Sequence, residues 1–220
     1  QFGKTSSIEP LANVVLGAGK LSTVGAIDSI HKTKTFQDLA AHFDKVHDIR
    51  FMGAGHMSMY MGAGAVEGRL IAPSDFAGKK MRSMGPAENA LLGALGANPQ
   101  AMSFGDVPPA LQTGVIDGLL TSLGKFITTD KSAPGIYVMT PEESAKIKKA
   151  EGGATNEWIK SKVNDTGDKL TDQFTAEAQE MVAANPPGSS ALEKTNCADY
   201  EKYFAMYAKG TELHGAKNRK

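Results

Sequence analysis

The sequence predicts an α/β fold with a largely parallel sheet. Between residues 79 and 122, short apolar stretches alternate with stretches that carry helix-start and helix-end residues. This order gives parallel strands with helices packed on the sheet. The chain of 220 residues is long enough for one large α/β domain or two small lobes. Its longest apolar runs are far shorter than the ~20 residues that span a bilayer.

Charge and cysteine content narrow the class of protein. Lys plus Arg and Asp plus Glu each number 24, and no basic stripe is present, which argues against nucleic acid as a partner. Cys197 is the single cysteine, so neither an intrachain disulfide nor a thiol metal cluster is expected. The first residues, QFGKTSS, resemble the interior of a protein, so we expect a leader or more to be missing.

The first third of the chain predicts three elements. An apolar helical segment within residues 8–30 is followed by a possible short strand, LSTVGAI (21–27). TFQDLAAHFDKVH (35–47) predicts an amphipathic helix, because its apolar residues recur at helical spacing. IRFMGAG (49–55) predicts a strand that runs into a glycine turn.

The next elements form the first strand–helix–strand unit. KKMRSM (79–84) predicts a strand. In the following helix, Pro86 occupies a first helical position, Glu88 lies in the first turn and Gly96 comes just past the end. AMSF (101–104) predicts the next short strand.

A second helix and a third strand complete the β-α-β-α-β pattern. We expect the carboxylate of Asp106 to cap the helix. Pro108 and Pro109 fall in its first turn, where backbone N–H groups have no intrahelical partners, so proline costs little there. Gly114 supplies a left-handed exit, and VIDGLLTS (115–122) predicts a buried strand.

The remainder of the chain is more polar and mostly helical. IYVM (136–139) predicts a strand, and Thr140 and Glu143 form the capping box of the helix that follows it. The predicted helices are TPEESAKIKKA (140–150), TNEWIKSKVND (155–165), FTAEAQEMV (174–182) and CADYEKYFAMYAKGTEL (197–213).

The GAGK stretch (17–20) is better interpreted as a glycine turn than as a phosphate-binding loop. The phosphate-loop motif requires Gly at position 14 and Ser or Thr at position 21, but this chain has Val14 and Leu21. The dinucleotide fingerprint also fails, because Ser22 stands where its third Gly belongs.

The histidines and methionines of the chain are weak indications of a metal-binding site. His31, His42 and His47 lie close in sequence, but their spacing is not HExxH, and we expect His42 and His47 on different helix faces. Solvated helix histidines are the favoured interpretation, and no metal site is predicted. The methionines of FMGAGHMSMYMG (51–62) fit a core or a cleft lining better than a copper site. No G-x-S-x-G motif or other catalytic constellation is present, so no enzyme is predicted.

Three motifs carry a resemblance to a known family. PSDFAGKKMR (73–82), LGANP (95–99) and ALQTGVIDG (110–118) follow one another without a gap along residues 73–122. They resemble motifs of the DctP family, the solute-binding proteins of TRAP (tripartite ATP-independent periplasmic) transporters. The match thins over 50–72.

The resemblance implies a two-lobed, periplasmic-binding-protein-like (type II) fold with mixed, largely parallel sheets and a ligand cleft between the lobes. Residues 1–72 would be the remainder of lobe 1, and residues 73–122 the core of lobe 2. Residues 123–220 would contribute a crossover strand, second-lobe helices and a C-terminal helix that packs across the lobes. The chain is shorter than the family norm, so we expect the opening strand–helix–strand to be missing.

The resemblance also implies a function, that of a periplasmic receptor which closes on a small organic acid and delivers it to TRAP membrane permease subunits. We expect this receptor to be a monomer and to need no cofactor. Which acid is bound, how many carboxylates it carries and whether an ion binds with it stay open. Two alternatives stay open as well. One is a ligand-sensing or scaffold protein of the same fold, and the other is an α/β enzyme that uses His56 or Asp117.

Three residues match ligand-contact positions of the family. Arg82 matches the position that binds the ligand carboxylate, Phe104 an aromatic or apolar position that packs against the ligand, and Thr121 a polar contact. All three lie at or near the carboxyl ends of predicted strands, where open α/β sheets place ligands. The arginine fork can bind both carboxylate oxygens, and the N-termini of the two helices add favourable dipoles.

Other positions depart from the family pattern. Pro108 stands where relatives usually have Tyr. Gly55 and His56 fall where many relatives carry a second Arg, which favours a ligand with one carboxylate. His56 is then a candidate for a pH-dependent contact, and Tyr60 is a further candidate. Asp117 is expected to be structural.

Overall fold

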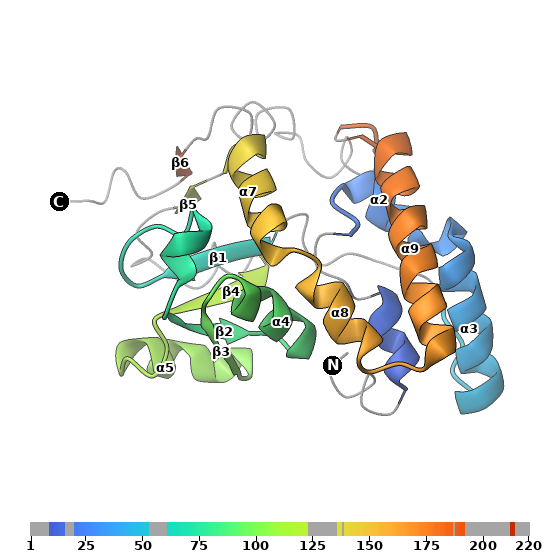
Figure 1. Cartoon of the computed structure of the whole chain (residues 1–220), viewed down its shortest axis with the longest axis horizontal. Coiled ribbons are helices and arrows are strands. Elements are labelled where there is room, and N and C mark those ends of the chain that lie inside the picture. Colours follow the sequence, from blue (N-terminus) through green and yellow to red (C-terminus); the bar gives the residue numbers. More distant parts are fainter. Residues whose placement is uncertain are drawn as a thin grey trace. The chain divides into compact units, whose positions relative to one another are not determined.

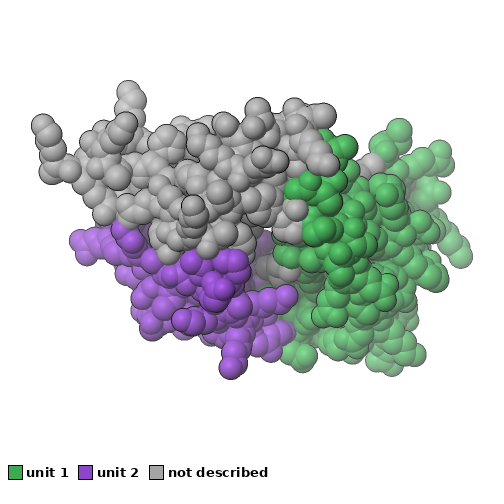
Figure 2. Space-filling view, turned by 90° about the horizontal axis from the view of Figure 1, so that it is seen from above, with its two compact units in different colours: residues 1–57, 155–200 green, residues 58–154, 201–220 purple. Residues whose placement is uncertain are grey.

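The computed structural model describes residues 9–15, 20–52, 61–122, 136–137, 139–186, 188–191 and 212–213. The chain divides into two compact units, residues 1–57 with 155–200 and residues 58–154 with 201–220 (Figure 2). The described elements include helices and a mixed sheet, so the predicted α/β class is confirmed. The division into two units agrees with the predicted two-lobed fold.

The first unit is helical in the part that the structure describes (Figure 1). Its elements are η1 (Pro10–Val15), α2 (Val24–Asp28), η2 (Ile30–Lys32), α3 (Lys34–His47), α8 (Ala154–Lys160, all but its first residue) and α9 (Asp165–Ala184). Helix α9 contacts η1, α2 and α3. The buried core that these contacts enclose consists of Val14, Ile30, Leu39 and Phe174.

Helix α3 confirms the helix predicted over residues 35–47. It begins after Thr33, whose hydroxyl oxygen accepts a hydrogen bond from the backbone N–H of Phe36 at 3.3 Å. It ends at Asp48, which takes the left-handed conformation with φ of 52°. Leu39 and Phe43 are buried on one face of the helix. The cap and the apolar face are both local signals, which explains the accurate prediction.

Two strand predictions in the first unit are wrong. Residues 21–27 contain the start of α2, because the Thr23 hydroxyl accepts from the N–H of Ala26 at 3.2 Å and caps a helix. A β-branched residue at a cap position looks like part of a strand in the sequence. Residues 49–52 form no strand either, and residues 53–55 of that predicted element lie outside the described residues.

The second unit contains a four-stranded mixed sheet (Figure 1). Its strands are β1 (Met61–Ala65), β2 (Lys80–Ser83), β3 (Asn98–Ala101) and β4 (Gly118–Ser122), in the order β1-β4-β2-β3. Strand β2 is parallel to both β3 and β4, whereas β1 is antiparallel to β4. The predicted β-α-β-α-β unit and the largely parallel sheet are therefore confirmed.

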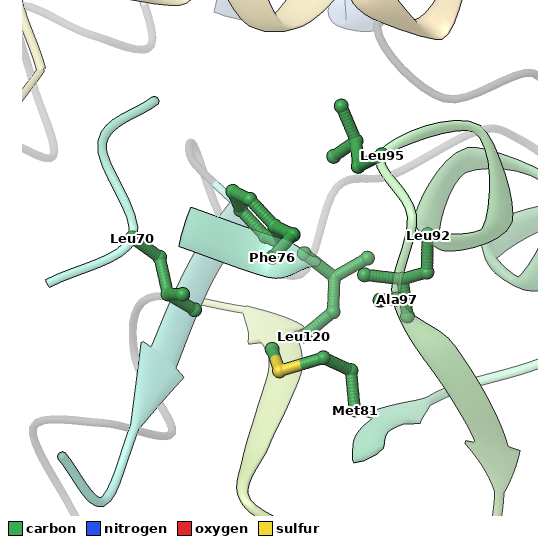
Figure 3. Packing of buried hydrophobic residues seen from close by; sticks show 7 residues of the cluster. All are labelled: Leu70, Phe76, Met81, Leu92, Leu95, Ala97 and Leu120. Carbon is green, nitrogen blue, oxygen red and sulfur yellow. The ribbon is translucent and has the colours of Figure 1, made fainter. Parts of the chain in front are cut away.

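The two faces of this sheet are covered differently. Met81 and Leu120 pack with α4 (Pro86–Ala94) on one face. Figure 3 shows this cluster, whose members are Leu70, Phe76, Met81, Leu92, Leu95, Ala97 and Leu120. The other face packs against α5 (Val107–Gln112) through Leu119. The second cluster contains Val107, Ala110 and Ile116, with Met102, Phe104, Leu111 and Leu119 against it.

Strand β3 lies three residues earlier than predicted. It spans 98–101 instead of 101–104, and it contains Pro99. Proline is tolerated there because β3 is the edge strand, so no ladder partner needs its missing N–H. The carboxylate of Asp106 does not cap α5 as predicted, because it accepts a hydrogen bond from the Ser103 hydroxyl at 2.6 Å.

The remaining elements follow the prediction in part. Helix α7 (Pro141–Glu151) has the predicted capping box, in which the N–H of Thr140 donates to the Glu143 carboxylate at 2.8 Å. The helices predicted at 155–165 and 174–182 correspond to α8 and α9, although α9 begins nine residues earlier than expected.

The predicted terminal helix lies largely outside the described residues. Its last two residues, Glu212–Leu213, form strand β6 instead of a helix. They pair with β5 (Ile136–Tyr137), which confirms the start of the strand predicted at 136–139.

Candidate ligand-binding site

Arg82 is a buried cation in the centre of the sheet. It is the third residue of β2, and the residue is 5% exposed. Its Nε donates to the carbonyl oxygen of Met102 at 3.1 Å, and its Nη1 donates to that of Leu120 at 3.2 Å. Two backbone carbonyls from different segments therefore fix the plane of the guanidinium group.

No described residue accepts a hydrogen bond from Nη2 of Arg82, and no described carboxylate forms a salt bridge with it. Among the described residues, the charge that acts on Arg82 is that of Glu88, in the first turn of α4. Burial lowers the pKa of Arg82, and the charge of Glu88 opposes this shift. The guanidinium stays protonated all the same.

Glu88 is itself affected by its surroundings. Burial raises the pKa of the Glu88 carboxyl, while a backbone hydrogen bond and the charge of Arg82 act in the opposite direction. The carboxylate also occupies the helix N-terminus that we expected to favour a ligand anion. In the sequence, Glu88 indicates only a helix start, and nothing there points to its relation to Arg82.

Phe104 lies beside the guanidinium. It begins the short 3₁₀ helix η4 (Phe104–Asp106), and its ring centroid is 5.8 Å from Cζ of Arg82. This distance allows a cation–π interaction. The ring is half-buried and packs against the α5 cluster.

Thr121 lies on the same face of the sheet as Arg82. Arg82 is the register partner of Leu119 in β4, and Thr121 follows Leu119 by two residues, so the alternation of side chains puts all three on one face. Thr121 is 3% exposed. The structure thus brings Arg82, Phe104 and Thr121 to the α5 face of one sheet.

The connections around β2 create the switch point at which α/β sheets bind ligands. The chain leaves β2 toward α4 on one face and leaves the neighbouring β3 toward α5 on the opposite face. Ligands of open α/β sheets bind outside the carboxyl ends of such strands. The order β1-β4-β2-β3 puts the reversal between β2 and β4, and Arg82 lies there, because its Nη1 bonds the carbonyl of Leu120 in β4.

Asp117 has the structural position that we expected. Its carboxylate accepts a hydrogen bond from the N–H of Lys80 at 2.8 Å, and its own N–H donates to the Lys80 carbonyl at 2.8 Å. Its carbonyl accepts from the N–H of Val66 at 2.9 Å. Asp117 therefore links the segments that lead into β2 and β4 to the end of β1. The candidates His56 and Tyr60 lie outside the described residues.

Comparisons with known proteins confirm the resemblance. The family model described as bacterial extracellular solute-binding protein, family 7 (DctP) matches residues 21–132. The C4-dicarboxylate-binding periplasmic protein DctP of Rhodobacter capsulatus is 52% identical over 50 residues. This match covers 22% of the chain and 15% of that relative, so the chain matches only a small part of its length.

Solved structures share the fold. The periplasmic ectoine-binding protein of the TeaABC TRAP transporter of Halomonas elongata is 17% identical, with a TM-score of 0.53 over 90% of this chain and 79% of that one. A TRAP periplasmic solute-binding protein of Citrobacter koseri, with bound D-glucuronate, is 19% identical, with a TM-score of 0.53 over 94% and 76%. Within the described residues, no helix is long and apolar enough to cross a membrane.

Proposed function

Because the chain belongs to bacterial extracellular solute-binding protein family 7, we propose that it binds a small organic acid and delivers it to the permease of a TRAP transporter. It would act in the periplasm as a binding protein and not as an enzyme. The observation that carries the proposal is the buried guanidinium of Arg82, which forms no salt bridge with a described residue.

The charge of Arg82 favours an anionic ligand. A buried cation is costly unless an anion or several hydrogen bonds compensate for its lost hydration. Two neutral carbonyls supply hydrogen bonds and hold the group in one orientation, but they do not neutralise its charge. A ligand carboxylate would do both, and the guanidinium fork suits its two oxygens.

The neighbours of Arg82 fit the rest of such a ligand. Phe104 offers an apolar ring for the carbon skeleton, and Thr121 offers a hydroxyl that can donate to a ligand oxygen. Two similar proteins are named for or with a carboxylate ligand. The relative from Rhodobacter capsulatus is named as C4-dicarboxylate-binding, and the Citrobacter structure has bound D-glucuronate. Mono- and dicarboxylates and sugar acids are therefore the classes to test.

A thermal-shift screen of the purified chain tests the proposal. A carboxylate present at 100 times its Kd adds about 2.7 kcal/mol to the free energy of unfolding, which raises the Tm by several degrees. If no acid in the panel shifts the Tm of the folded protein, the proposed function is wrong.

Two variants of Arg82 test its role. Arg82→Ala should weaken the binding of the acid that the screen identifies by about 2–5 kcal/mol, or roughly 1.5–3.5 decades in Kd. Arg82→Lys keeps the charge but loses the fork, so we expect an intermediate Kd. The control is Arg50→Ala, which removes an exposed arginine of the first unit. Equal Kd values for the parent and a folded Arg82→Ala variant would reject the assignment.

A further inference from the structure

Two histidines and a glutamate converge in the first unit, away from the sheet that carries Arg82. Glu9 directly precedes η1, and His42 and His47 lie in the C-terminal half of α3. The Nε2 atoms of His42 and His47 lie 2.9 Å and 3.0 Å from the same carboxylate oxygen, Oε2 of Glu9. The potential ligand atoms of all three residues lie within 4.8 Å of one another.

His42 and His47 leave α3 on different faces, as expected from their spacing, yet both contact Glu9. Residues five apart are about 140° apart around an α-helix, so the two side chains leave the helix in different directions. The Glu9 carboxylate lies between the two rings, and both imidazoles turn toward it. Glu9 carries no signal for this contact in the sequence, because 33 residues separate it from His42.

We propose that Glu9, His42 and His47 bind a divalent transition-metal ion, with Zn²⁺ the ion that fits them best. Two imidazole nitrogens and one carboxylate oxygen are a ligand set that zinc prefers, with water in a fourth position. Magnesium and calcium prefer sites built from oxygen atoms, so they should bind poorly here. The proposal is independent of the solute-binding function.

The spacing of the ligand atoms is close to that of a zinc site. Zinc bonds of about 2.0–2.2 Å in tetrahedral geometry separate neighbouring ligand atoms by about 3.4 Å. The present separations between each Nε2 and Oε2 are 2.9 Å and 3.0 Å. An expansion of about half an ångström is therefore needed, which small rotations of three side chains can supply. Each neutral ring would then carry its proton on Nδ1 and leave the Nε2 lone pair for the metal.

The surroundings hold the three side chains in place. Phe43 is 3% exposed, and its ring lies beside both imidazoles, with centroid distances of 6.1 Å to His42 and 5.5 Å to His47. The other oxygen of Glu9, Oε1, accepts a hydrogen bond from the N–H of Leu11 at 3.1 Å. This bond orients the carboxylate so that Oε2 faces the rings.

Charge and access also suit a metal ion. A glutamate carboxylate is ionised at neutral pH, so Glu9 supplies a negative charge to the site. The side chains of His42, His47 and Glu9 are 34%, 22% and 13% exposed, so an ion and a water ligand can reach them.

Calorimetric titration of the chain, freed of metal with EDTA, tests the site with ZnCl₂ and with MgCl₂ as the comparison. We expect saturable binding of one zinc ion, a higher Tm with zinc and no such change with magnesium. His47→Ala and Glu9→Gln should each weaken zinc binding at least about tenfold, as expected for the loss of a ligand. The control is His31→Ala, which removes an exposed histidine of η2 and should bind zinc like the parent.

The absorption of Co²⁺ in the visible range gives a second readout that needs no variant. Intense bands typical of four-coordinate cobalt, lost when zinc is added, would support the site even if a variant fails to fold. The absence of saturable zinc binding by the parent would overturn the proposal. Zinc binding unchanged in folded His47→Ala and Glu9→Gln variants would overturn it too.

Discussion

At the scale of single residues, the second unit contains two opposite charges, Arg82 and Glu88, and burial disfavours the charged form of each. Arg82 is buried against two carbonyl groups, and Glu88 lies in the first turn of the helix that follows its strand. Burial lowers the pKa of the first and raises the pKa of the second, and each charge partly offsets the shift of the other. A pair arranged in this way is sensitive to pH and to a competing anion.

Glu88→Gln should remove a pH-dependent part of the stability. A carboxyl whose pKa is raised in the folded state binds its proton more tightly there than in the unfolded chain. Its contribution is complete below the unfolded pKa near 4.5 and is lost as the pH rises through the raised folded pKa. Urea unfolding from pH 4 to pH 7 should show a smaller fall in the free energy of unfolding for Glu88→Gln than for the parent.

The control for this prediction is Glu67→Gln, which removes an exposed carboxylate of the same unit. A fall in stability of the same size in the parent and in Glu88→Gln would contradict the assigned role of burial at Glu88.

At the scale of elements, the close approach of β1 to β4 depends on a residue without a side chain. A Cβ atom built on Gly118 would overlap the carbonyl oxygen of Gly64 in β1 and lie 2.8 Å from Sδ of Met81. Gly118 is the register partner of Ala65 and of Met81, so it joins β4 to both neighbours. Little room is available for even a methyl group there.

Gly118→Ala should therefore lower the free energy of unfolding by about 1–3 kcal/mol, the usual cost of overpacking. Gly93→Ala is the matched control, because within the described part of the chain only neighbouring backbone of α4 itself lies within 4 Å of its Cβ position. Alanine there should stabilise the helix by up to about 1 kcal/mol. Chemical denaturation of both variants measures the difference. Equal effects of the two substitutions would show that the β1–β4 contact is looser than described.

The sequence predicted elements well where their ends depend on local chemistry. Helix α3 was predicted within one residue, because Thr33 caps it and its apolar spacing is regular. The Thr140–Glu143 capping box fixed the start of α7 in the same way. Strand β3 was misplaced because an edge strand accepts Pro99, and sequence alone does not show which strand lies at the edge.

The candidate sites were less predictable than the elements. Arg82, Phe104 and Thr121 could be named from a family motif and from strand ends, and the structure does bring them to one face of the sheet. The carbonyls of Met102 and Leu120 that orient Arg82 carry no signal in the sequence, because every residue has a carbonyl. The contact of Glu9 with His42 and His47 depends on packing between segments far apart in the chain.

At the scale of the whole molecule, the two candidate sites belong to different compact units with separate cores. Glu9, His42 and His47 lie in the first unit, whereas Arg82, Phe104 and Thr121 lie in the second. The two ligands should therefore stabilise different segments of one chain. Bound ligands suppress the local opening through which amide hydrogens exchange.

Hydrogen exchange read by mass spectrometry can separate the two effects. Zinc should slow exchange in peptides that cover residues 9–15 and 34–47, because it links η1 to α3. A bound carboxylate should slow exchange in peptides that cover 80–83, 102–106 and 118–122, where Arg82 and its partners lie. The opposite result is that the carboxylate slows exchange in residues 9–47 and leaves exchange in residues 80–122 unchanged. That result would contradict the assignment of the solute site to the sheet that contains Arg82. Such a result would not bear on the zinc site, because zinc and the carboxylate are added in separate experiments.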